Sequence, residues 1–162
     1  MPIIINKQAI LTLIIEQLKT DLTISEKALQ IARETAVHSD CMGSSRYETM
    51  GLEASYLAQG QGTRLLEVER ALTYFKQLIV VETVTTIGLS SLIELEDDQG
   101  DRQLLWLAAD AGGLKIRYDN RPVTVITPRA PLGRALVGKE KGDEFECNIN
   151  GQSRLYKILT TS

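Results

Sequence analysis

The residues best suited to chemistry lie close together, between His38 and Glu48. Asp40 and Glu48 offer carboxylates, the groups that a hard cation such as Mg²⁺ prefers, and Arg46 suits a phosphate or a carboxylate. Simpler roles compete with these, because Asp40 fits a loop or a helix cap and Glu48 fits a capping box with Ser45. The positive charge of Arg46 close by also disfavours a cation. The cluster alone therefore does not predict a metal centre.

Two long apolar repeats flank this cluster, between Gln8 and Leu78. Each repeat advances in alternating steps of four and three residues, which places its members on one seam of a helix. The seam residues are Leu11, Ile15, Leu18, Leu22, Ser25, Leu29, Ala32 and Ala36, and then Gly51, Ala54, Ala58, Gln61, Leu65, Val68, Leu72, Phe75 and Ile79. A narrow seam must be buried against a partner helix, and the short polar break at residues 38–45 favours antiparallel neighbours. We therefore predict an antiparallel coiled-coil hairpin over residues 1–80, with the cluster at its tip.

Local signals support two uninterrupted helices. Asn6 precedes the first repeat and can cap it, and no proline falls inside either repeat. Gly60 and Gly62 are the exception, because each helical glycine costs about 1 kcal/mol relative to alanine. They indicate either a close approach of the helices or a kink. An arm of some thirty residues would extend roughly 45 Å, a shape better suited to a probe than to an enzyme.

Composition narrows the class of protein. The chain has 162 residues and a net charge of −3, so it lacks the basic field that drives nucleic-acid binding. Cys41 and Cys147 lie in different halves without further ligands nearby, which is neither a disulfide framework nor a zinc pattern. Neither a signal peptide nor a membrane span is recognisable in the sequence. We expect a cytoplasmic protein whose partner is another protein.

Beyond Leu78 the pattern becomes typical of strands. The candidate strands are Ser91–Glu96, Gln103–Ala108, Gly113–Tyr118, Val123–Thr127, Glu144–Ile149 and Leu155–Thr160. Asp97–Asp101 and Asn148–Gly151 read as turns, and Pro131–Val137 reads as one short helix that Gly138 can terminate. We predict an α+β fold, in which residues 81–162 form an antiparallel β domain with one short helix.

Two segments resemble a known family. Residues 128–144, PRAPLGRALVGKEKGDE, resemble a motif of the Gre family of bacterial transcript-cleavage factors, the GreA/GreB-like elongation factors. Residues 47–58, YETMGLEASYLA, resemble a coiled-coil segment of a Gre-related branch with an altered tip. The resemblance covers the whole chain in layout and is most specific over Thr127–Ile158.

The resemblance implies a fold and a partner. Residues 81–162 would form an FKBP-like domain without isomerase activity, which docks on bacterial RNA polymerase at the rim of its secondary channel. Arg129, Pro131 and Arg134 lie in the matched segment and are the docking candidates, although a solvated helix face would equally explain both arginines. The hairpin would enter the channel, where acidic tip residues of the family help to hold a magnesium ion of the polymerase active site.

The tip departs from the family pattern. Asp40 occupies the position of the family's aspartate, whereas Gly43 and Arg46 occupy the positions of its two glutamates. The tip residues expected at the polymerase active centre are therefore Asp40, Gly43, Arg46 and Glu48. Only Asp40 remains to share a magnesium ion, and only together with the polymerase. The altered tip argues against stimulation of transcript cleavage.

We therefore predict a Gre-like factor that modulates elongation, as a monomer, without catalytic activity of its own or sequence-specific DNA binding. The alternative is a small FKBP-like peptidyl-prolyl isomerase with a coiled-coil appendage. Against it, an isomerase pocket is lined by aromatic side chains, and the C-terminal half offers only Trp106, Tyr118, Phe145 and Tyr156. A third alternative is a structural adaptor that dimerises through its coiled coil.

Overall fold

The computed structural model describes residues 5–40, 45–81 and 84–162, with the side chains of residues 39, 40 and 45–48 excepted. Internal contacts divide the chain into two compact units. Residues 15–73 form the first unit, and the rest of the chain forms the second. Within the described ranges, no helix is long and apolar enough to cross a membrane.

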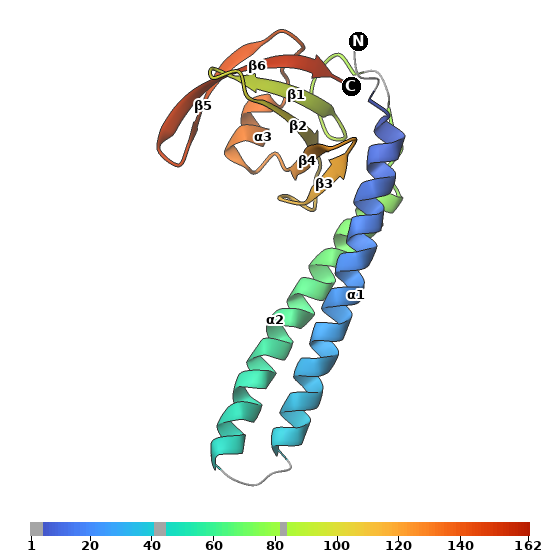
Figure 1. Cartoon of the computed structure of the whole chain (residues 1–162), viewed down its shortest axis with the longest axis vertical. Coiled ribbons are helices and arrows are strands. Elements are labelled where there is room, and N and C mark those ends of the chain that lie inside the picture. The colour runs from blue at the N-terminus through green and yellow to red at the C-terminus, as the bar shows by residue number, and fades with distance from the viewer. Residues whose placement is uncertain (1–4, 41–44, 82–83) are drawn as a thin grey trace. The chain divides into compact units, whose positions relative to one another are not determined.

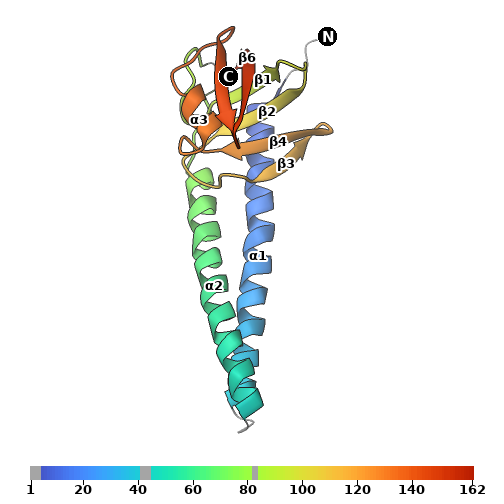
Figure 2. The ribbon, with the colours of Figure 1, turned by 90° about the vertical axis from the view of Figure 1, so that its left-hand side faces the viewer.

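The first unit consists of two long helices. Helix α1 spans Lys7–Asp40 and helix α2 spans Ser45–Lys76. They lie side by side and run in opposite directions in both views (Figure 1 and Figure 2). This confirms the predicted hairpin. Asn6 caps α1 as expected, because its Oδ1 accepts a hydrogen bond of 3.1 Å from the backbone N–H of Ala9.

Burial follows the predicted seam over most of its length. The seam side chains buried within this unit are Leu18, Ser25, Leu29 and Ala32 on α1, and Ala54, Val68 and Leu72 on α2. The prediction was wrong at its end, because α2 stops at Lys76 and Ile79 is 83% exposed. The apolar spacing continues past Lys76 in the sequence, but the helical backbone does not.

The two glycines of α2 neither break the helix nor bring the two helices into close contact. The helix is assigned without interruption from Ser45 to Lys76, so no break is seen at Gly60 or Gly62. A Cβ atom added at either glycine would meet no other atom within 4 Å, so neither permits a close helix approach. Both positions therefore have room for a side chain.

The second unit is built on one six-stranded sheet. Its strands are β1 (Leu92–Asp97), β2 (Arg102–Leu107), β3 (Lys115–Tyr118), β4 (Arg121–Ile126), β5 (Glu144–Ile149) and β6 (Gln152–Thr161), in the order β3-β4-β2-β1-β6-β5. All six predicted strands are present, and both predicted turns join neighbouring strands. At the first turn, Asp97 Oδ1 accepts hydrogen bonds of 2.9 Å from the N–H groups of Gln99 and Asp101.

The sheet differs from the predicted antiparallel sheet at one strand pair. Strands β2 and β4 are parallel, with Leu104 opposite Val123, whereas the other neighbours are antiparallel. After β2 the chain passes to the sheet edge, forms β3 there, and turns back as β4 beside β2. The sheet is therefore mixed.

Helix α3 (Pro131–Leu136) covers part of one sheet face, as Figure 1 shows. Its Leu136 is fully buried in the core formed by inward residues of the sheet, including Leu95, Leu107 and Ile158. In the same core the rings of Phe145 and Tyr156 stack at 5.6 Å, and burial raises the pKa of the Tyr156 hydroxyl above its usual value.

Gly133 sets how closely α3 approaches the preceding segment. A Cβ at this position would overlap the backbone carbonyl oxygen of Thr127. Backbone cannot move aside as a flexible side chain can, so the position requires glycine. This is the physical role of the glycine in the LGRAL part of the sequence motif.

We predict opposite effects for two glycine substitutions. Gly133→Ala should destabilise the sheet unit by about 1–3 kcal/mol, because the added methyl group overpacks against backbone. Gly60→Ala should stabilise the hairpin by up to about 1 kcal/mol, because alanine is the better helix former and has room there. Urea unfolding of both variants measures the two changes, and wild-type stability for Gly133→Ala would contradict the close approach.

Candidate functional site

The predicted tip lies only partly within the described residues. The end of α1 at Asp40 and the start of α2 at Ser45 lie at the same end of the hairpin (Figure 1). Arg46 and Glu48 belong to the first turn of α2, but their side chains and that of Asp40 are outside the described structure, as is Gly43 altogether. The assignment of these four residues to the tip site therefore stays a prediction, as does the capping box of Ser45 and Glu48.

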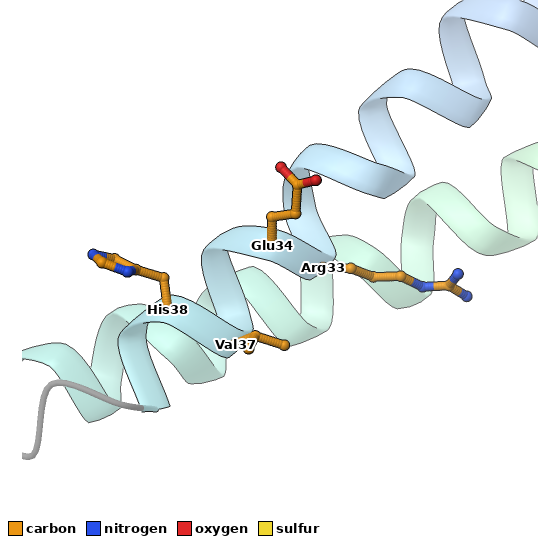
Figure 3. A pocket seen from close by; sticks show the side chains of 4 residues that line it. All are labelled: Arg33, Glu34, Val37 and His38. Atoms are coloured by element: carbon orange, nitrogen blue, oxygen red, sulfur yellow. The ribbon is translucent and has the colours of Figure 1, made fainter.

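An open pocket of about 440 Å³ lies on the last turns of α1. Figure 3 shows its four residues, Arg33, Glu34, Val37 and His38, with Arg33 and Glu34 extending in different directions. Glu34 Oε1 accepts a hydrogen bond of 3.1 Å from Gln30 Nε2. Over the described ranges, no group of three or more His, Cys, Asp or Glu residues is placed to hold a metal ion.

A second hollow of about 620 Å³ lies between the two helices. We call it the hairpin groove and define it by its lining residues, Arg33, Ala36, Val37, Ser55, Ala58, Gln59 and Gly62. Most of these side chains are small, so the two helices leave space between them at this level. Sequence reasoning missed the groove, because the small residues Ser55, Ala58 and Gly62 form it only together with residues of the other helix.

The predicted docking residues lie around α3. Arg129 precedes the helix, Pro131 is its first residue, and Arg134 lies in its last turn. All three are exposed. Neither arginine forms an ion pair with a described residue, so both guanidinium groups are available to an acidic partner. Their role in docking stays a prediction.

A buried lysine that the sequence did not indicate joins the start of α1 to the sheet unit. Lys7 is only 3% exposed. Its Nζ donates a hydrogen bond of 2.7 Å to the carbonyl oxygen of Val81 and lies 5.5 Å from the centre of the Trp106 ring. The backbone N–H of Asn6 also donates to the Tyr118 hydroxyl at 3.1 Å. These contacts fix the first turn of α1 within the second unit.

We expect Lys7→Met to destabilise the sheet unit by about 1.5–3 kcal/mol, because it leaves a carbonyl group without its charged donor. Unfolding in urea can be followed through the fluorescence of Trp106, the only tryptophan of the chain. Lys19→Met is the matched control, since Lys19 is exposed on the same helix. Equal stability of the two variants would show that the buried ammonium group contributes nothing.

Comparison with known proteins finds relatives named as transcription elongation factors. No protein-family model matches the chain. Transcription elongation factor GreA of Ruegeria pomeroyi is 25% identical over 134 residues, which cover 83% of this chain and 78% of that protein. GreA of Halorhodospira halophila is 25% identical over 136 residues, covering 82% and 80% of the two chains.

Among solved structures, GreA factor homolog 1 (Gfh1) of Thermus thermophilus is 26% identical and covers 91% of this chain and 94% of its own. Its TM-score is 0.39, which is too low to establish a shared fold. The resemblance to GreA therefore rests on the sequence relatives.

The chain has a helical hairpin followed by a mixed sheet with one short helix, and the relatives described here are named GreA. These relatives are elongation factors of the GreA/GreB-like kind. The chain is similar to GreA/GreB-like elongation factors, and the resemblance inferred from its motifs is confirmed. The isomerase alternative is not favoured, because the relatives described here carry the name of transcription elongation factors.

Proposed function

We propose that this protein is a Gre-like transcription factor of the cytoplasm, which binds bacterial RNA polymerase and modulates elongation. Residues 81–162 are the docking domain, and the hairpin tip enters the secondary channel of the polymerase. The observation that carries this proposal is the relationship to GreA across about four fifths of both chains. The chain acts as a monomer, has no catalytic activity of its own and reads no DNA sequence.

The electrostatics around α3 support docking through this part of the chain. Arg129 and Arg134 are exposed and have no ion-pair partner among the described residues. Lys139 follows the helix, with its Nζ 5.5 Å from the centre of the Phe145 ring. Such a surface complements an acidic patch on a partner, and charge complementarity mainly affects the association rate and the choice of partner.

The composition of the tip supports a role other than cleavage. Asp40 is the one carboxylate that remains at a family position, and Arg46 replaces another. A magnesium ion is held by one or two carboxylates together with substrate oxygens, and a nearby guanidinium opposes the binding of a cation. The tip therefore occupies the channel without supplying the metal site that cleavage requires. A factor of this kind competes with cleavage factors for the polymerase.

Docking is tested by binding of the full-length chain to core RNA polymerase. The wild-type protein should co-migrate with the polymerase in gel filtration. Charge reversal of both arginines, Arg129→Glu with Arg134→Glu, should weaken binding by roughly tenfold or more, because favourable charge pairs become repulsive. Lys115→Glu is the control, as it reverses an exposed charge on β3. Equal losses in the control and the double variant would refute docking through α3.

The role of the tip is tested with stalled transcription complexes. We expect the wild-type protein to leave the nascent RNA uncleaved, and to lower the cleavage that an added GreA produces. Asp40→Ala should bind polymerase as the wild type does but change the elongation rate measured with the protein bound. Cleavage that the wild type stimulates and Asp40→Ala does not would show that a single carboxylate suffices.

A further inference from the structure

The exposed face of distal α2 is unusually poor in charge. From Ala54 to Thr63 the helix carries no charged residue. In the adjoining motif, Gly51–Ala58, the small residues Gly51 and Ala54 are buried in the seam. The large ones point outward instead: Leu52, Tyr56 and Leu57 are 56%, 64% and 56% exposed. The packing of the hairpin therefore explains the small residues of this motif but not the large apolar ones.

The hairpin groove is formed in part by the same stretch of α2. Ser55, Ala58, Gln59 and Gly62 line it from α2, within the uncharged stretch. Val37 lines it from α1 and is 64% exposed. With a volume of about 620 Å³, the groove can take a large side chain together with part of its neighbours.

Arg33 gives the groove its charge. It is the only charged residue among those lining the groove, it is exposed, and it makes no ion pair with any described residue. The neighbouring Glu34 is hydrogen-bonded to Gln30 and does not line the groove. With no carboxylate on the α2 side, a guanidinium group at an apolar groove favours a carboxylate ligand, which it can bind through two parallel hydrogen bonds.

We propose that the hairpin groove seats an apolar segment of RNA polymerase that carries an acidic side chain, with the carboxylate paired to Arg33. This proposal rests on the proposed function and adds a second contact, separate from the tip and from α3. The groove thereby holds the hairpin at one depth in the channel.

Two pairs of full-length variants test the proposal. Gly62→Leu fills the groove, whereas Gly60→Leu adds the same side chain outside it, and neither added Cβ meets an atom within 4 Å. Both should raise the thermal stability of the hairpin, because leucine is a better helix former than glycine. Arg33→Glu reverses the charge at the groove, and Lys27→Glu reverses an exposed charge of α1 that does not line it.

The readout is the dissociation constant for core RNA polymerase, measured by fluorescence anisotropy of the labelled chain. Gly62→Leu and Arg33→Glu should each weaken binding by roughly tenfold, while Gly60→Leu and Lys27→Glu stay within about twofold of wild type. If all four variants bind as wild type does, the groove is not a contact and docking through α3 stands alone. If wild type itself fails to bind, the proposed function falls as well.

Two other outcomes would also overturn the groove proposal. Equal weakening by Arg33→Glu and Lys27→Glu would mean that only the overall charge of α1 matters. Sedimentation of the free protein tests whether a second copy of the chain, rather than the polymerase, occupies the groove. If Gly62→Leu abolishes self-association that the wild type shows, without changing its affinity for polymerase, the groove is a dimer contact.

Discussion

A hairpin of two helices can bury only the surfaces that the helices turn toward each other, so its seam must supply the tertiary packing of residues 15–73. The seam is not uniform along its length. Toward the end of α2 it buries the larger side chains Val68 and Leu72, whereas the distal part buries alanines such as Ala32 and Ala54. Large seam residues stabilise more per position, because burial of apolar area is the main favourable term.

The small distal residues have a consequence for function as well as for stability. Where the facing side chains are alanine and glycine, the helices leave the hairpin groove between them. The helices pack less tightly there, and the space between them is open to a partner. Leucine side chains in the seam would fill that space. Gly60 and Gly62 add to this difference, since each lowers helix propensity without enabling a closer contact. In the proposed docking, the same small residues therefore lower the stability of the hairpin and leave space for the partner.

In the sheet unit, the packing of α3 on the core determines where two exposed arginines lie. Gly133 lets α3 lie against the backbone of Thr127, and Leu136 fixes the helix in the core. With the buried face of this short helix packed on the core, Arg129 before the helix and Arg134 in its last turn are exposed to solvent. The position of both charges is therefore set by packing that a mutation at Gly133 would disturb.

Local sequence patterns predicted most of these elements. The heptad spacing of the hairpin and the strand-and-turn pattern of the sheet both involve residues that are close together in sequence. Features that depend on residues distant in sequence were missed. The parallel pairing of β2 with β4 is one, and the buried contact of Lys7 with Val81 and Trp106 is another. The groove depends on which small residues face each other across two helices, and its position could not be read from either helix alone.

Hydrogen–deuterium exchange of the full-length chain, free and bound to core RNA polymerase, tests the two-contact docking most directly. Docking as proposed predicts slower exchange in two separate segments, around Pro131–Leu136 and across Ala54–Gly62, with α1 between Leu11 and Leu22 unchanged. Protection of neither segment, in a sample shown to contain the complex, would contradict the docking of this protein on the polymerase through α3 and the hairpin.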